Sequence, residues 1–496
     1  MDLAKLQNGS DVRGVALAGV EGEAVTLDEA AVRAIAGGFA RFLRARLGKE
    51  NFRVSVGRDS RLSGEAIART LCETLAACGA AVTDLGLCTT PAMFMTTVTG
   101  ENPFEAAVMI TASHLPWNRN GLKFFTAAGG AESADVREIL RLAAEETPLA
   151  PGGSVAQGEF METYAAILRE KIIAAANGGE KPLAGKRIVV DAGNGAGGFF
   201  AERVLAPLGA DTTGSRYLDP DGHFPNHVPN PELPEAMDSI RAAVLESHAD
   251  FGIIFDTDVD RAGAVLSDGE ELNRNRLIAL ISAILLREHP GTAIVTDSVT
   301  SAGLAEFIAA HGGVHRRFRR GYRNVINEAL RLNAAGHDCQ LAIETSGHAA
   351  LKENFFLDDG AYLVTRFLME IAAGRELESL LTGLREPVES REFRLKILAE
   401  DFRAAGTAVL DSLTEYVKEQ PGWTLAPDNC EGVRVNLDKA HGDGWFLLRL
   451  SLHDPILPLN IESDKEHGAR TIARELAPFL AQQTGIDASA ALEFTL

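Results

Sequence analysis

The stretch Thr292-Ala-Ile-Val-Thr-Asp297 decides the fold class, because it is an apolar segment closed by an aspartate. A helical stretch follows at residues 302–311, and then Gly312-Gly-Val314 begins another short strand. A continuous apolar run, as opposed to an alternating one, is typical of a strand covered on both faces of its sheet. The order strand, helix, glycine and strand therefore predicts a βαβ unit.

The same layout occurs twice earlier in the chain. Arg53-Val-Ser-Val-Gly-Arg-Asp59 leads into a helical stretch and Gly79-Ala-Ala-Val82. Lys186-Arg-Ile-Val-Val-Asp191 leads into a helix at about 199–208 and then Gly209-Ala210. Any doubly wound protein repeats βαβ units, so generic similarity is the alternative interpretation. The wide spacing of the copies favours three tandem mixed α/β domains.

The last part of the chain has a different pattern. Residues 391–397, 431–437 and 445–450 resemble strands, and residues 401–419 form one helical stretch, which predicts an α+β domain. Glycine- and proline-containing segments separate the blocks. We therefore expect four domains, over residues 1–153, 154–268, 269–387 and 388–496.

Composition excludes several classes of protein. The 496 residues are 46% hydrophobic and 24% charged, as in an ordinary folded protein. A net charge of −21 disfavours binding to nucleic acid or to an anionic membrane. The most apolar stretch, 277–286, is too short to cross a bilayer, and no secretory leader is recognisable. Five cysteines without a C-x-x-C motif fit a reducing compartment, so we expect a cytoplasmic protein.

An acidic loop, Asp256-Thr-Asp-Val-Asp-Arg261, directly follows the apolar strand at residues 251–255. Carboxylates at alternate positions of a loop can converge on one point. Three hard oxygen donors there suit Mg²⁺ and leave coordination positions for phosphate or water. The loop therefore predicts a magnesium site.

The acidic loop has features in common with two other motifs and with an ordinary turn. An EF-hand needs glycine at position six and glutamate at position twelve, where this chain has Arg261 and Ser267. An aspartyl-phosphate phosphatase motif normally has threonine or valine where this chain has Asp260. A solvated acidic turn is the third alternative, although unpaired carboxylates this close repel one another without a cation.

A second loop runs from Thr111 to Lys123, after the apolar strand at residues 106–110. It contains Ser113 followed by His114, and a serine at a strand end is a plausible nucleophile or phosphate carrier. Serine beside histidine is a weak signal by itself, because a serine that caps a turn is common. Together with the acidic loop, the signal is stronger.

In this order along the chain, several motifs resemble the signatures of the α-D-phosphohexomutase family, which contains phosphoglucomutases, phosphomannomutase/phosphoglucomutases and phosphoglucosamine mutases. They are Thr111-Ala-Ser-His114, Asn120-Gly-Leu-Lys123, Asp256-Thr-Asp-Val-Asp-Arg261 and Glu344-Thr-Ser-Gly-His348. Further matches are Ser10-Asp-Val-Arg-Gly14, residues 56–64, Asp191-Ala-Gly-Asn-Gly195 and residues 221–231. The resemblance extends from Ser10 to about Ser463. It implies four domains in a heart-shaped arrangement around a central cleft.

The resemblance also implies a reaction centre. Ser113 would carry the phosphoryl group, and its phosphate would hold Mg²⁺ together with Asp256, Asp258 and Asp260. The remaining catalytic positions implied by the match are Arg13, His114, Lys123, Arg261 and His348. Their charges suit a transferring phosphoryl group and proton movement at a sugar hydroxyl.

Substrate binding is implied at two other loops. Glu344 and Ser346 would grip two adjacent sugar hydroxyls, and Arg323 stands where the family usually has lysine. The loop that would bind the nonreacting phosphate differs more from the family's sequence. Arg449 and Ser451 are retained, but His453 replaces threonine. His453 could substitute as a donor, best when protonated.

The expected function is interconversion of hexose 1-phosphate and hexose 6-phosphate, of mannose and/or glucose. The reaction would pass through a phosphoserine and a hexose 1,6-bisphosphate, which would also act as the activator. A phosphoglucosamine mutase and a phosphosugar-binding paralogue with little turnover are the alternatives. The expected partner is a small phosphosugar, with neither nucleic acid nor membrane, and the protein would be a monomer or homodimer.

Overall fold

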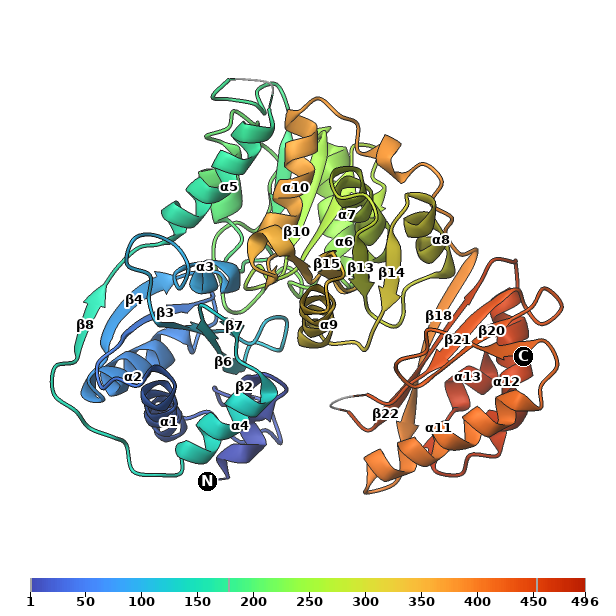
Figure 1. Ribbon diagram of the computed structural model, residues 1–496, viewed down its shortest axis with the longest axis horizontal. Helices are drawn as coiled ribbons and strands as arrows, with labels where there is room; N and C mark the ends of the chain where they lie inside the picture. The colour runs from blue at the N-terminus through green and yellow to red at the C-terminus, as the bar shows by residue number, and fades with distance from the viewer. Residues whose placement is uncertain (1, 177–178, 452–453, 496) are drawn as a thin grey trace. The chain divides into compact units, whose positions relative to one another are not determined.

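A computed structural model describes residues 2–176, 179–451 and 454–495. The chain forms two compact units, each of them continuous in space but not in sequence. The first unit comprises residues 1–281 and 346–380, and the second comprises residues 282–345 and 381–496. Mixed α/β sheets dominate both, and the last sheet is antiparallel, as the sequence predicts (Figure 1).

The N-terminal sheet of the first unit has the strand order β1-β2-β6-β5-β3-β4-β8, with β7 paired to β6. Its strands are β1 (Gln7–Asn8), β2 (Asp11–Val15), β3 (Arg53–Arg58), β4 (Ala81–Leu87), β5 (Ala106–Ile110), β6 (Arg119–Thr126), β7 (Gly129–Gly130) and β8 (Ser154–Gln157). Strands β5, β3, β4 and β8 run parallel. The segments that follow β3 and β5 therefore leave the same edge of the sheet.

Helices pack on both faces of this sheet. They are η1 (Leu3–Leu6), α1 (Glu29–Leu47), α2 (Gly64–Ala77), α3 (Thr90–Met95) and α4 (Ser133–Leu142). Apolar side chains of α1, α2 and α4 form one buried core with the strands. The expected strand at 53–59 and the helix after it are confirmed.

The second sheet of the first unit has the order β12-β11-β10-β9. Its strands are β9 (Ile188–Asp191), β10 (Phe251–Phe255), β11 (Ala262–Leu266) and β12 (Glu271–Leu272). Strands β9 and β10 are parallel, whereas β10 and β11 pair antiparallel. The acidic loop is thus the connection between β10 and β11, at the carboxyl end of a fully buried strand.

The βαβ unit expected after Asp191 is incomplete. In place of a helix over 199–208 there is a short π-helix, η2 (Phe200–Leu205), and the expected strand after Gly209 is only an isolated bridge between Arg187 and Asp211. The helix thus begins where it is expected but ends earlier, at Leu205. Before it, the backbone approaches other segments closely at two glycines. A Cβ on Gly195 would lie 2.6 Å from the Thr257 carbonyl oxygen, and one on Gly198 would lie 2.2 Å from that of Leu218.

Further elements complete the first unit. They are α5 (Met161–Ala175), α6 (Pro234–Ser247), β16 (Ala349–Leu351), η3 (Lys352–Asn354), β17 (Leu357–Asp358) and α10 (Gly360–Ala372). Strands β16 and β17 form a hairpin directly after His348. The N-terminus of α10 is capped by Asp359, which also accepts a 2.7 Å hydrogen bond from the Tyr164 hydroxyl on α5.

In the second unit, β14, β13 and β15 are parallel neighbours. The elements here are β13 (Ala293–Thr296), α8 (Ala302–Ala310), β14 (Val314–Arg317), α9 (Tyr322–Ala334) and β15 (Cys339–Ile343). Helix α7 (Arg274–Glu288) precedes them, and η4 (Glu378–Leu381) precedes the last domain. The strand and helix expected at 292–297 and 302–311 are confirmed.

The last sheet has the order β19-β20-β21-β22-β18-β23, and all its neighbours are antiparallel. Its strands are β18 (Glu389–Ile397), β19 (Trp423–Leu425), β20 (Val433–Leu437), β21 (Gly444–Leu448), β22 (Ile456–Ser463) and β23 (Ile486–Asp487). Helices α11 (Phe402–Lys418), α12 (Gly468–Ala481) and α13 (Ser489–Glu493) share its buried core. This confirms the α+β expectation for the C-terminal part.

Two expectations from composition can be compared with the described residues. All five cysteines are free thiols there, four of them buried and Cys430 half-buried. Among the described helices, none combines the length and the hydropathy needed to span a bilayer.

The contact between α1 and α4 generates a prediction about stability. Replacing a mid-helix glycine by alanine normally stabilises a helix by about 1 kcal/mol. A Cβ on Gly38, however, would lie 2.4 Å from the Ile139 carbonyl oxygen and 2.6 Å from the Ala143 nitrogen. We expect Gly38→Ala to destabilise the protein by roughly 1–3 kcal/mol through overpacking, measured as a lower Tm in scanning calorimetry.

Gly37 supplies the matched control in the same helix. A Cβ there would be 3.1 Å from the Thr147 Oγ1, an atom at the end of a side chain that can rotate away. We expect Gly37→Ala to leave the Tm unchanged or slightly higher. A Tm raised equally by both substitutions would contradict close backbone packing between α1 and α4.

Candidate active site

The serine loop leaves the sheet at the end of β5 and turns sharply at Ser113, which has a φ of 49°. Ser113 is buried, and its hydroxyl faces the acidic loop. The Ser113 Oγ donates a 2.9 Å hydrogen bond to Asp256 Oδ2 and accepts one of 2.9 Å from Arg261 Nη2. The hydroxyl therefore lies between a carboxylate and a guanidinium, which is a suitable environment for an oxygen that exchanges a phosphoryl group.

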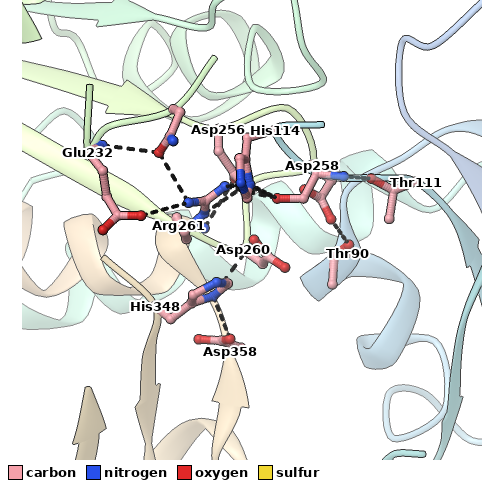
Figure 2. Close-up of polar contacts among 12 residues, drawn as sticks. Thr90, Thr111, His114, Glu232, Asp256, Asp258, Asp260, Arg261, His348 and Asp358 are labelled. Carbon is pink, nitrogen blue, oxygen red and sulfur yellow. Dashed lines mark hydrogen bonds and ion pairs between the residues drawn. The ribbon is translucent and has the colours of Figure 1, made fainter. Parts of the chain in front are cut away.

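The three aspartates of the acidic loop converge, as the sequence predicts. One carboxylate oxygen from each of Asp256, Asp258 and Asp260 lies within 4.8 Å of the others (Figure 2). All three side chains are buried. The turn between them places the β-branched Val259 at a φ of 67°, a backbone region that such residues rarely adopt. Backbone strain at a convergent carboxylate cluster is typical of a functional site.

Burial and mutual repulsion disturb the acidity of this cluster. Burial, together with the charges of Asp260 and Asp258, raises the pKa of Asp256 well above its usual value. Burial and Asp260 also raise the pKa of Asp258. Burial alone would raise the pKa of Asp260, but the charges of Lys123 and His348 outweigh burial and hold it below its usual range. Of the three carboxylates, only Asp260 therefore has counter-charges that outweigh the effect of burial on its pKa.

A divalent cation fits this donor set. The Oδ1 atom of Asp258 is buried and has no hydrogen-bond partner among the described residues, and its Oδ2 accepts a 2.5 Å hydrogen bond from the Thr90 hydroxyl. An oxygen without a partner beside two other carboxylates leaves negative charge that a hard cation can neutralise. The residues that could hold Mg²⁺ are therefore Asp256, Asp258 and Asp260, with Ser113 adjacent to Asp256.

Arg261 connects the two loops. Its Nε donates to Asp256 Oδ2 at 3.1 Å, and its Nη2 also donates to His114 Nδ1 at 2.6 Å. An arginine can only donate, so His114 Nδ1 is the acceptor and this nitrogen carries no proton. On the other side of the guanidinium, the Asn230 side-chain oxygen accepts from Nη1 at 3.1 Å. Arg261 is thereby fixed against the Ser113 hydroxyl.

Lys123 and Arg13 come from neighbouring strands of the N-terminal sheet. Lys123 on β6 is paired with Asp260, with 2.9 Å between Nζ and Oδ2. Arg13 on β2 lies opposite Gly121 of β6 and donates to the Ala112 carbonyl oxygen at 2.6 Å and to Asp11 at 2.8 Å. Both cations therefore stand beside the two loops, Lys123 at the acidic loop and Arg13 at the residue before Ser113.

His348 lies between two carboxylates, Asp260 and Asp358 (Figure 2). Its Nδ1 is 2.7 Å from Asp358 Oδ2 and 3.8 Å from Asp260 Oδ1. Burial opposes the charged imidazole, but Asp358 and Asp260 outweigh it and raise the pKa of His348 to about 9. Sequence reasoning missed Asp358 and Thr90, which lie in segments without a recognisable motif.

The expected sugar loop is divided between the two units. Glu344, at the end of β15, belongs to the second unit and accepts a 2.7 Å hydrogen bond from the Gly321 amide. Ser346 belongs to the first unit, and its buried hydroxyl has no hydrogen-bond partner among the described residues. Arg323 lies in the first turn of α9, within the second unit.

The loop expected to hold the distal phosphate follows β21 in the second unit. Burial and the positive charge of Arg320 lower the pKa of Arg449, so two cations influence each other here. The Ser451 hydroxyl accepts from the Asp454 amide at 3.2 Å. His453 lies outside the described residues. Arg320 is thus a cation near Arg449 in addition to Arg323, the expected substrate-binding residue of the same segment.

Most of the arginine-rich segment 315–323 is used inside the second unit. Arg317 pairs with Asp428 at 2.5 Å and donates to the Ser301 carbonyl oxygen at 2.9 Å. Arg316 pairs with Glu328 at 3.0 Å, and Arg319 donates to the Cys430 carbonyl oxygen at 3.3 Å. Three arginines of this segment are therefore occupied by contacts within the second unit.

Comparison with known proteins places the chain in a family. Models of the α/β/α domains I, II and III of phosphoglucomutase/phosphomannomutase match residues 4–149, 162–269 and 273–388. A phosphomannomutase/phosphoglucomutase of Pseudomonas aeruginosa is 32% identical over 444 residues, 89% of each chain.

Solved structures agree with this assignment. A phosphoglucomutase/phosphomannomutase family protein from Burkholderia thailandensis has a TM-score of 0.81 and 28% identity, covering 98% of this chain and 99% of that one. An Aspergillus fumigatus N-acetylphosphoglucosamine mutase, solved with GlcNAc-6P and magnesium, shares the fold at a TM-score of 0.54 and 14% identity, over 91% and 97% of the two chains. Because the domain models cover most of the chain and the bacterial relative matches nearly its full length, the protein belongs to the phosphoglucomutase/phosphomannomutase family of α-D-phosphohexomutases.

Proposed function

We propose that this phosphohexomutase interconverts the 1-phosphate and 6-phosphate of glucose and/or mannose, with Ser113 as the phosphoryl carrier. The observation that carries the proposal is the position of the Ser113 hydroxyl, which is hydrogen-bonded to both Asp256 and Arg261 at 2.9 Å. An anionic phosphoryl group on this oxygen would face the Arg261 guanidinium and a cluster suited to Mg²⁺. Hexose 1,6-bisphosphate is both the intermediate and the activator that first loads Ser113.

The chain's own groups account for both proton positions of the transfer. When a bisphosphate loads Ser113, an Oγ–P bond forms while the bond between phosphorus and the sugar oxygen breaks. Asp256 accepts the hydrogen bond of the serine hydroxyl and takes its proton. His348 is charged below a pKa of about 9, holds Asp358 through Nδ1, and gives a proton to the leaving sugar oxygen. The opposite transfer reverses both steps.

Cations of the site stabilise the transferring group. Arg261 contacts Ser113 Oγ directly, while Lys123 and Arg13 border the two loops. Mg²⁺ held by Asp256, Asp258 and Asp260, with the phosphate of Ser113, supplies positive charge to the phosphoryl oxygens. Positioning and charge stabilisation are the main sources of catalysis in phosphoryl transfer. His114 contributes through its hydrogen bond to Arg261.

Substrate recognition is proposed for the loops of the sugar and of the distal phosphate. Glu344 and Ser346 would bind two sugar hydroxyls, since one accepts hydrogen bonds and the other both donates and accepts. Arg449, with Arg323, Ser451 and His453, would bind the nonreacting phosphate. The proximity of Arg320 to Arg449 supports a phosphate there, because an anion relieves the repulsion between the buried Arg449 and the half-buried Arg320. The free thiols fit activity in the cytosol. The protein would act as a monomer or homodimer.

A coupled mutase assay tests the function. We expect turnover of glucose 1-phosphate or mannose 1-phosphate with Mg²⁺ and glucose 1,6-bisphosphate, and little turnover of glucosamine 1-phosphate and N-acetylglucosamine 1-phosphate. Preference for glucosamine 1-phosphate would instead identify a phosphoglucosamine mutase. Binding of these sugars without turnover of any of them would identify a binding paralogue.

The role of Ser113 gives a second expectation in the same assay. Ser113→Ala should lower kcat by a factor of about 10³ or more, because it removes the hydroxyl that would carry the phosphoryl group. Ser282→Ala is the matched control, since this buried hydroxyl on α7 has no hydrogen-bond partner among the described residues. A Ser113→Ala protein as active as the control would exclude Ser113 as carrier.

Substitutions in the acidic loop should change the Mg²⁺ requirement of the activity without lowering the thermal stability of the metal-free protein. We expect Asp256→Asn, Asp258→Asn and Asp260→Asn each to raise the Mg²⁺ concentration for half-maximal activity by roughly tenfold or more. Without metal, Asp258→Asn should melt at the same or a higher temperature, because it removes one of three repelling carboxylates. Asp250→Asn, at the opposite end of β10, should leave the Mg²⁺ response unchanged. An unchanged Mg²⁺ response in all three variants would mean an acidic turn without metal.

Replacement of Arg449 tests how much binding of the distal phosphate contributes to kcat/KM. A guanidinium can make two charge-assisted hydrogen bonds to phosphate, so Arg449→Ala should lower kcat/KM by about 30- to 1,000-fold. Arg394→Ala, which removes an exposed arginine of β18 paired with Glu392, should have no effect. An Arg449→Ala protein within about twofold of the parent would show that this arginine does not bind the substrate.

A further inference from the structure

Arg61 is a fully buried cation in the turn between β3 and α2. All the hydrogen bonds that its guanidinium makes within the described residues go to main-chain carbonyl oxygens of the serine loop. The acceptors are Ser113 at 2.5 Å, Leu115 at 2.5 Å, Pro116 at 2.8 Å and Arg119 at 2.9 Å. One guanidinium thus connects the nucleophile's own carbonyl with three further points of the same loop.

Asp59, in the same turn between β3 and α2, is hydrogen-bonded to the start of the serine loop. The Asp59 Oδ2 accepts a 2.7 Å hydrogen bond from the Thr111 hydroxyl, and Thr111 Oγ1 in turn accepts from the Ser113 amide at 2.9 Å. Asp59 also accepts from the Arg61 amide at 2.9 Å, and the two side chains form an ion pair at 3.4 Å. The turn after β3 therefore forms hydrogen bonds with the serine loop on both sides of Ser113.

These hydrogen bonds surround a residue with an unusual backbone conformation. Ser113 has a φ of 49°, in the left-handed region that non-glycine residues rarely adopt. Carbonyl oxygens that point at one place repel each other unless donors or a cation stand between them. The planar fork of arginine offers five donors in fixed directions, whereas the ammonium of lysine is a compact point charge with three. Arginine is thus the residue that can satisfy four carbonyls at once.

We propose that Arg61, together with Asp59 and Thr111, is a positioning residue that holds the Ser113 hydroxyl in the orientation needed for phosphoryl transfer. The inference rests on the proposed role of Ser113. Arg61 would act through the backbone of the loop and not through the substrate. Its loss should therefore reduce kcat and leave KM for the phosphosugar nearly unchanged.

Kinetics of Arg61→Lys and Arg61→Met test this proposal. We expect kcat to fall about 100-fold or more, because a displacement of about 1 Å can cost that much, with KM within about threefold of the parent. Arg366→Met is the matched control. Arg366 is also a buried arginine, on α10, and is paired with Glu353 at 2.8 Å. Its replacement should lower the Tm without a comparable loss of kcat.

Hydrogen exchange supplies a readout that does not depend on activity. In Arg61→Lys, amides of the peptide 111–119 should exchange faster than in the parent, while those of the peptide 251–255 should not change. Faster exchange of both peptides together, or a kcat within about threefold of the parent, would overturn the proposal. A lower kcat with unchanged exchange at 111–119 would overturn it as well.

A third variant and a separate phosphorylation measurement complete the test. If neither Arg61 variant folds, Thr111→Val decides, since it removes only the hydroxyl that joins Asp59 to the Ser113 amide. Faster exchange at 111–119 with lower kcat in Thr111→Val would support the proposal, and parental values would refute it. If the parent gains no phosphate on Ser113 when incubated with hexose 1,6-bisphosphate and Mg²⁺, the proposed function fails, whereas hydrogen exchange still shows whether Arg61 holds the loop.

Discussion

Three carboxylates buried at one point are the constraint on which the first unit depends. Asp256, Asp258 and Asp260 repel one another, and burial removes the water that would screen them. Such a cluster persists only if counter-charges converge on it. Lys123 and Arg261 supply two of these charges. The strands that carry these residues, β6 and β10–β11, belong to different sheets, so the charge balance of the site also joins the two sheets of the unit.

Local patterns were sufficient to predict the strands and the loops that follow them. An apolar segment ending in aspartate predicts a strand and its carboxyl end, as at β3, β9 and β13, and alternate aspartates predict convergence. Contacts between distant segments could not be predicted in this way. Asp358 beside His348 and Arg61 beneath the serine loop depend on how separate chain segments fold together. The π-helical form of residues 200–205 could not be predicted either, because hydrophobic periodicity does not distinguish it from an α-helix.

In the second unit, some cations are used in structural contacts, and others are proposed to bind the substrate. Arg317 and Arg434 are committed to structure, since Arg434 donates to the carbonyl oxygens of Ser298 and Thr300 and stacks 3.6 Å from the Trp445 ring centroid. Arg449 lies under the influence of the like charge of Arg320. A charged pair of this kind can bind phosphate even where neutral donors of a loop have been replaced. If Arg449 binds the nonreacting phosphate as proposed, the replacement of threonine by His453 would bear on substrate choice more than on the class of reaction.

The central claim is that the oxygen held between Asp256 and Arg261 carries the phosphoryl group. The most direct measurement is a single turnover of dephosphorylated protein with hexose 1,6-bisphosphate labelled in both phosphates, quenched in acid and followed by peptide mass spectrometry. The account predicts one labelled phosphoryl group per chain, on the peptide that contains Ser113, formed at least as fast as steady-state turnover. Label on another residue, or turnover without any labelled protein, would contradict it.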